Sequence, residues 1–110
     1  MNQPIEIEVE TLADWMKNRD DVILVDCREV SEHDTAKITG SVLIPMSQWA
    51  AKAGELDAYK DKQIVVHCHH GGRSMRVTNW LRQNGFPTAL NLAGGIHAWS
   101  QRIDPSVPQY

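Results

Sequence analysis

Short apolar runs alternate along the chain with polar stretches that carry apolar residues at helical spacing. The apolar runs are rich in β-branched residues, and the first of them alternates apolar with charged residues as a half-buried edge strand does. They predict five strands, at residues 5–9, 22–26, 41–45, 63–68 and 88–92. The stretches between and after them predict or permit helices, at residues 11–18, 28–37, 47–54, 73–84 and 94–101.

Residues suited to helix ends mark several of these helices. Thr11 can cap the first helix and Ser47 the third, because a side-chain hydroxyl accepts a hydrogen bond from an unpaired N–H of the first turn. Gly54 is expected to end the third helix, and Gly85 follows the fourth. On the fourth helix the buried stripe is predicted to consist of Val77, Trp80 and Leu81.

The order of the elements defines the fold class. Short apolar strands that alternate with helices form right-handed βαβ units, which predicts an α/β fold with a parallel sheet and helices on both faces. In such sheets ligands bind beyond the carboxyl ends of the strands. Cys68 follows directly on one of those strand ends, so the sequence predicts that the functional site includes this thiol.

Length and composition limit the classes of protein to which the chain can belong. Its 110 residues fit one domain, residues 1–110, with one core. With 42% hydrophobic and 23% charged residues, the chain is predicted to be folded rather than disordered. A formal net charge of -3 predicts that nucleic acid is not a partner. No apolar run approaches the roughly 20 residues that span a bilayer, so no membrane association is expected.

The start of the sequence and the two cysteines suggest a cellular location. The first ten residues, "MNQPIEIEVE", lack both the positive and the apolar region of a secretory signal. We therefore expect a cytoplasmic protein in which Cys27 and Cys68 are free thiols.

The segment "CHHGGRS", residues 68–74 and called the cysteine loop below, has the features of a nucleophile site. The N-terminus of the following helix supplies unpaired N–H groups and partial positive charge, which favour a thiolate. Gly71 and Gly72 permit a tight turn that aims further amides inward. The sequence thus predicts Cys68 as nucleophile and an anion-binding loop formed by His69, His70, Gly71, Gly72, Arg73 and Ser74.

Four segments resemble single-domain rhodaneses, which are sulfurtransferases that carry sulfur as a cysteine persulfide. The cysteine loop is similar to their active-site loop, and "LVDCRE" (24–29) resembles the Asp-x-Arg-Glu segment of that family. "ITGSVLIP" (38–45) looks like the family's His-Ile-x-Gly-Ala-x-Asn-Ile-Pro segment, and "NLAGGIHAW" (91–99) like its Gly-Gly-x-x-x-Trp signature. All four occur in the family's order and together span most of the chain.

The resemblance implies a five-stranded parallel sheet and a two-step sulfur transfer. Cys68 would take the sulfane sulfur of a donor such as thiosulfate and pass it to cyanide, a thiol or a protein, with no metal or organic cofactor. His69 departs from the family, because many relatives that use thiosulfate have a basic residue at this position, and a histidine is only partly protonated near neutral pH. A protein or low-molecular-weight persulfide is the alternative donor.

Three other functions compete with sulfur transfer. Cell-cycle phosphatases and arsenate reductases of this fold place five residues between cysteine and arginine, whereas here there are four, His69 to Gly72. They also need a general acid, for which neither Asp26 nor Asp34 stands out.

A sulfur-carrier module that serves a protein partner would use the same persulfide. The ending "DPSVPQY" resembles the close of rhodanese domains fused to enzymes that activate sulfur-carrier proteins.

A metal site is the last alternative, since "HCHH" with His97 and Cys27 offers nitrogen and sulfur ligands. The expectation is nevertheless that no metal site is built, because His67 and Cys68 would point to opposite faces of a strand and no Cys-x-x-Cys pair occurs.

Cys27 is read as a core side chain, with a resolving thiol as the alternative. Asp26 and Arg28 are expected to brace the loop, with Arg28 facing a thiosulfate anion as the alternative.

Overall fold

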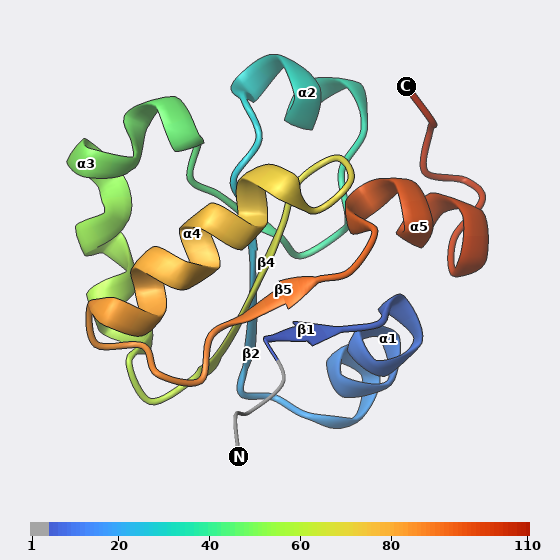
Figure 1. The fold of residues 1–110 in the computed structure, drawn as a ribbon. Helices are drawn as coiled ribbons and strands as arrows, with labels where there is room; N and C mark the ends of the chain where they lie inside the picture. Colours follow the sequence, from blue (N-terminus) through green and yellow to red (C-terminus); the bar gives the residue numbers. More distant parts are fainter. Residues whose placement is uncertain (1–4) are drawn as a thin grey trace.

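The computed structural model describes residues 5–110, which form a twisted sheet with helices packed against it (Figure 1). The five strands pair in the order β1-β5-β4-β2-β3, and every pair is parallel. This confirms the predicted α/β class and parallel sheet. The strands are β1 (Glu6–Ile7), β2 (Val22–Asp26), β3 (Val42–Leu43), β4 (Gln63–His67) and β5 (Leu90–Leu92).

The helices connect the strands and close the chain. The connection between β3 and β4 also contains 3-10 helices, labelled η, before and after a short α-helix. The helical elements are α1 (Val9–Asn18), α2 (Val30–Thr35), η1 (Met46–Gln48), α3 (Trp49–Lys52), η2 (Ala53–Tyr59), α4 (Gly72–Gln83) and α5 (Gly95–Arg102).

Each face of the sheet has its own apolar core, because successive side chains of a strand point to opposite faces. Val65 faces α1 and α5, and packs in one cluster with Leu12 and Trp99. Val66, the next residue of β4, belongs to a second cluster that contains Leu56 of η2 and Leu81 of α4. Figure 1 shows α4 across one face of the sheet and α1 beside α5. Burial on both faces explains why β2 and β4 are continuously apolar.

The structure corrects several predicted element ends. The first strand is short, because Val9 already belongs to α1 and is fully buried there, and the N-cap of this helix is Glu8 rather than Thr11. Nor does Gly54 end the helical segment, since its backbone φ is not positive and η2 continues to Tyr59. Gly85 does follow α4, with a φ of 100°.

Trp80 is a further correction, since it is 41% exposed rather than part of the buried stripe of α4. Its ring makes an edge-to-face contact with Trp49, with ring centroids 5.7 Å apart. Val77 and Leu81 are buried as predicted.

Within residues 5–110, none of the helices is both long and apolar enough to cross a membrane. The expectation about a secretory signal depends in part on residues 1–4, which lie outside the described residues.

Candidate active site

The cysteine loop begins where β4 ends and runs into α4. Cys68 follows the last residue of β4 and is 1% exposed. Gly71 is the N-cap of α4 with a φ of 118°, a left-handed backbone conformation that side chains other than glycine adopt rarely. The chain therefore reverses direction between strand and helix, as the glycines predicted. Gly72 is different: its φ is ordinary and a Cβ there would meet no atom within 4 Å, so the turn depends on Gly71 alone.

The sulfur of Cys68 accepts three hydrogen bonds from the turn and the first helical residues. The Gly71 N–H lies 3.1 Å from Sγ, the Ser74 N–H 3.4 Å and the Ser74 hydroxyl 3.3 Å. Burial opposes ionisation of the thiol, but these hydrogen bonds and the backbone of His70 outweigh it and lower the pKa of Cys68 below its ordinary value. The structure thus has the arrangement that stabilises a thiolate.

Arg73 belongs to the predicted anion-binding loop, but its positive charge is paired with a carboxylate. Its guanidinium forms two hydrogen bonds to the carboxylate of Glu32 on α2, at 2.7 and 2.9 Å. Hydrogen bonding from Arg73 lowers the pKa of Glu32 to about 2. The pair fastens the start of α4 to α2, and within the described residues the hydrogen bonds to the sulfur come from Gly71 and Ser74.

The N-terminus of α5 supports the other side of the cysteine loop. The N–H groups of Ile96 and His97 donate to the carbonyls of Cys68 and His69, at 3.0 and 3.1 Å. Gly95 makes this approach possible, because a Cβ there would lie 2.5 Å from the Cys68 carbonyl oxygen and 2.6 Å from that of His69. Gly95 therefore admits a close backbone contact beside the cysteine loop.

Asp26 and Arg28 form a fully buried ion pair behind the loop. Two guanidinium nitrogens donate to the two carboxylate oxygens at 2.9 and 2.7 Å, and both side chains are 0% exposed. Arg28 also donates to the carbonyls of Ala36 and Glu32 and to the hydroxyl of Tyr110. This geometry corresponds to a brace between β2, α2 and the C-terminal segment. An anion in solution has no access to Arg28, and Asp26 is likewise closed to a leaving group.

Cys27 lies one strand away from Cys68 and is fully buried. Burial, followed by the nearby Cys68 and Asp26, raises the pKa of its thiol to about 12. These surroundings correspond to a core side chain rather than a resolving thiol.

Asn91 was not singled out by the sequence, although an amide within the apolar strand β5 is an unusual choice. Its Nδ2 donates to Glu6 and to the carbonyl of Gly71, which turns its Oδ1 toward the hydroxyl of Ser74. The single Ser74 proton therefore has two acceptors, Asn91 Oδ1 and Cys68 Sγ. A thiolate is a stronger acceptor than a neutral amide, so ionisation of Cys68 favours rotation of the hydroxyl toward sulfur.

Tyr110 is a second residue that the sequence did not indicate. Its ring stacks on His69 at a centroid distance of 4.0 Å and an interplanar angle of 8°. Its hydroxyl accepts a hydrogen bond from Arg28 and donates one to Glu32. The C-terminal segment thereby contacts both the cysteine loop and the Arg73–Glu32 pair, a long-range contact for which the sequence carries no local signal.

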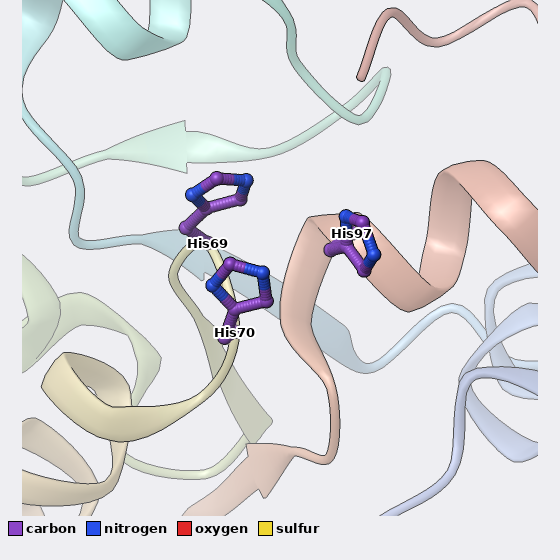
Figure 2. Close-up of side chains that lie close together, drawn as sticks. All are labelled: His69, His70 and His97. Carbon is purple, nitrogen blue, oxygen red and sulfur yellow. The ribbon is translucent and has the colours of Figure 1, made fainter. Parts of the chain in front are cut away.

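The five histidines occupy three different environments. His67 is fully buried, and burial lowers its pKa to about 4. His33 lies 2.8 Å from Asp26. The remaining three converge above the cysteine loop, which brings together only part of the metal-ligand set considered from the sequence: His69, His70 and His97 (Figure 2).

Comparisons with known proteins bear on the family of the chain. Residues 8–102 match the rhodanese-like domain family. A sulfurtransferase of Allochromatium vinosum is 34% identical over 102 residues, which cover 93% of this chain and 94% of that protein. The chloroplastic rhodanese-like/PpiC domain-containing protein 12 of Arabidopsis thaliana is 37% identical over 96% of this chain, and the chain spans 37% of its length.

A solved structure gives the same result for the fold. The crystal structure of a rhodanese-related protein from Thermoplasma volcanium superimposes with a TM-score of 0.81 and 30% identity, covering 96% of this chain and 98% of that one. Sequence, fold and site geometry lead to one assignment: the chain belongs to the rhodanese-like domain family.

Proposed function

We propose that the protein is a sulfurtransferase that transfers a sulfane sulfur through a persulfide on Cys68. The observation that carries the proposal is the set of hydrogen bonds from Gly71 and Ser74 to a sulfur whose pKa is lowered. A thiol in these surroundings is a nucleophile at neutral pH.

In the first half-reaction the Cys68 thiolate attacks the outer sulfur of a small anionic donor such as thiosulfate. A bond forms between Sγ and that sulfur, the S–S bond of the donor breaks, and sulfite leaves with the electron pair. The persulfide sulfur carries the negative charge, and the N–H groups that surround Sγ are placed to stabilise it.

In the second half-reaction a thiophilic acceptor attacks the outer sulfur of the persulfide. The acceptor is cyanide, a thiol or a protein, and the Cys68 thiolate is the leaving group. The hydrogen bonds that lower the pKa of Cys68 make it a better leaving group, so the same contacts serve both steps. Because both cysteines are free thiols and a reducing compartment keeps thiols free, the proposal includes a reducing, cytoplasmic location.

The length of the loop supports sulfur rather than phosphate chemistry. Four residues separate Cys68 from Arg73, and a shorter ring of amides suits one sulfur atom better than a phosphate with three oxygens. The phosphatase alternative also needs a general acid, and Asp26, one of the two candidates, is buried in its pair with Arg28.

Intact-mass measurement after incubation with thiosulfate tests the proposal. We expect a gain of one sulfur atom that a reductant reverses, in the wild-type protein and in the matched control Cys27→Ala. In Cys68→Ser the gain and the formation of thiocyanate from cyanide are both abolished, while the melting temperature is retained. Phosphate-ester turnover without any sulfur gain, or undiminished transfer by Cys68→Ser, would contradict the proposal.

A further inference from the structure

Three imidazole rings meet at the outer side of the cysteine loop. His69 and His70 come from the loop itself, and His97 comes from α5 (Figure 2). One ring nitrogen of each residue lies within 4.8 Å of the corresponding nitrogens of the other two. In Figure 2 a nitrogen of His69 and one of His70 lie on the side of their rings that faces His97.

Two of the three rings are held in place by surrounding structure. The backbone of His97 donates to the carbonyl of His69 at 3.1 Å, which fixes α5 against the loop. The ring of His69 stacks on Tyr110, whose hydroxyl is itself held by Arg28 and Glu32. His70 is exposed and its ring centroid lies 4.9 Å from that of His97, so it can move toward the other two rings at little cost.

The nitrogens of the cluster are suited to donate lone pairs. His97 Nδ1 is buried and has no hydrogen-bond partner among the described residues, which is costly for a polar atom unless something binds it. A neutral imidazole is the form that binds metal ions.

The charges beside the cluster do not oppose a cation. Arg73 is the nearby positive group, but its guanidinium is paired with Glu32 at 2.7 Å. The negative carboxylate of Glu32 thereby offsets the positive charge of Arg73 beside the cluster.

We propose that His69, His70 and His97 form a binding site for a divalent transition-metal ion of the Zn²⁺ class. Three imidazole nitrogens with a water molecule as fourth ligand are a known zinc ligand set, whereas Mg²⁺ and Ca²⁺ require oxygen ligands. With metal–nitrogen bonds of about 2.0–2.1 Å, the nitrogens must approach to roughly 3.4 Å of one another. Rotation of the exposed His70 and small shifts of the other two rings bring the nitrogens to this distance.

The site reverses the sequence-based expectation, which rejected a metal centre because His67 and Cys68 point apart. The structure excludes His67 and Cys27, both of them fully buried, and retains His97, which the fold brings to the loop from α5. The inference is independent of sulfur transfer, since the proposed ligands do not include Cys68.

Calorimetric titration of the metal-free protein with Zn²⁺ tests this site. We expect one ion bound per chain, with the same affinity in Cys68→Ser, which lacks the catalytic thiol. His97→Ala should weaken binding by at least the 10–100-fold that loss of even an outer-shell partner causes. His33→Gln is the matched control, because it removes a histidine outside the cluster, and its affinity should equal that of the wild type.

His70→Ala provides a second variant on an exposed side chain, in case His97→Ala fails to fold, and should weaken binding to a similar degree. Titration with Co²⁺ identifies the ligands, since a thiolate ligand adds a sulfur-to-metal charge-transfer band. Absence of stoichiometric Zn²⁺ binding would overturn the site. So would unchanged affinity in folded His97→Ala and His70→Ala, or a charge-transfer band that disappears in Cys68→Ser. Because the titration requires no sulfur transfer, this proposal and the proposed activity fail separately.

Discussion

The two cysteines occupy equivalent positions on neighbouring strands, yet their surroundings have opposite effects. Cys27 follows β2 and Cys68 follows β4, and these strands are paired along their whole length. The exposed fraction is 0% for Cys27 and 1% for Cys68. Nevertheless the pKa of Cys27 is raised to about 12, whereas that of Cys68 is lowered. Burial is shared, so burial does not decide which thiol is reactive.

The helices that follow the two cysteines account for the difference. In α2 the side chain of the N-cap Glu29 accepts the N–H of the third helical residue, so an unpaired donor of that helix is already used. In α4 the N-cap is Gly71, which has no side chain to accept it, and the N–H groups of Gly71 and Ser74 point at the sulfur of Cys68. A helix start without a side-chain cap therefore leaves its donors available to a thiolate.

The largest expected effect comes from removing the support of the cysteine loop. In Gly95→Ala the new Cβ would lie 2.5 Å from the Cys68 carbonyl oxygen, so loop and helix must separate. We expect the rate of sulfur transfer to fall about 100-fold, because a displacement of about 1 Å in a catalytic group costs that much. Thiocyanate formation at saturating thiosulfate measures the loss.

Gly54→Ala is the matched control for this substitution. A Cβ at Gly54 meets no atom within 4 Å and its φ is not positive, so both rate and melting temperature should be unchanged. Full activity of Gly95→Ala would show that the contact between α5 and the loop does not position Cys68.

Alkylation of the native protein directly measures the difference in reactivity between Cys27 and Cys68. At pH 7 a thiol with a pKa of about 12 has about 1000-fold less thiolate than one at the ordinary 9.0, and Cys68 lies below that value. The more basic thiolate is the better nucleophile, which reduces the advantage of Cys68 to roughly 50-fold. Peptide mapping after brief iodoacetamide treatment should show at least this preference for Cys68. Equal labelling of Cys27 would disprove the contrast.

The sequence predicted the sheet well because its signals are local. Runs of β-branched residues mark β2 and β4, and burial on both faces leaves little else that such runs can form. Val9 was misplaced because it fits two periods, alternation with the strand before it and i, i+3 spacing with Leu12. Trp80 was misplaced because its spacing fits the buried stripe, whereas in the structure it is 41% exposed and its ring contacts Trp49.

The candidate site was predictable only where its residues are contiguous. Cys68, Gly71 and Ser74 lie in one loop, so their chemistry could be read from spacing. Glu32 and Tyr110 reach the site through long-range contacts. No local pattern predicts that Glu32 forms an ion pair with Arg73, or that the ring of Tyr110 stacks on His69.

Ser74→Ala should reduce the pKa difference between Cys68 and Cys27. Its effect on the transfer rate should be smaller than that of Gly95→Ala. Its hydroxyl lies 3.3 Å from Sγ, and a hydrogen bond to a charged group contributes about 1.5–3 kcal/mol, or roughly one to two pKa units. We expect the pKa of Cys68 to rise by that amount and the transfer rate to fall about 10-fold. Thiolate absorbance followed against pH gives the pKa.

Thr78→Val serves as the control for Ser74→Ala. It also removes a buried hydroxyl from α4, but that hydroxyl donates to the Ser74 carbonyl and not to the sulfur. Its effect should be on stability alone. A rise in the pKa of Cys68 as large as in Ser74→Ala would show that helix packing, rather than the hydroxyl, controls the thiol.

The smallest expected effect on the difference in reactivity between the two thiols comes from replacing His67, the residue before Cys68. Its carbonyl accepts the N–H of Cys27, and burial lowers the pKa of its ring from 6.5 to about 4. Below pH 6.5 the unfolded chain binds a proton that the folded protein does not. The stability that His67 contributes is therefore complete above pH 6.5 and is lost as the pH falls toward 4, by at most about 3 kcal/mol.

Urea unfolding should show this dependence of the free energy of unfolding on pH in the wild type and a weaker one in His67→Met. Cys68 should be alkylated in preference to Cys27 in both proteins. A change in that preference would mean that His67, and not only the start of α4, distinguishes the two thiols.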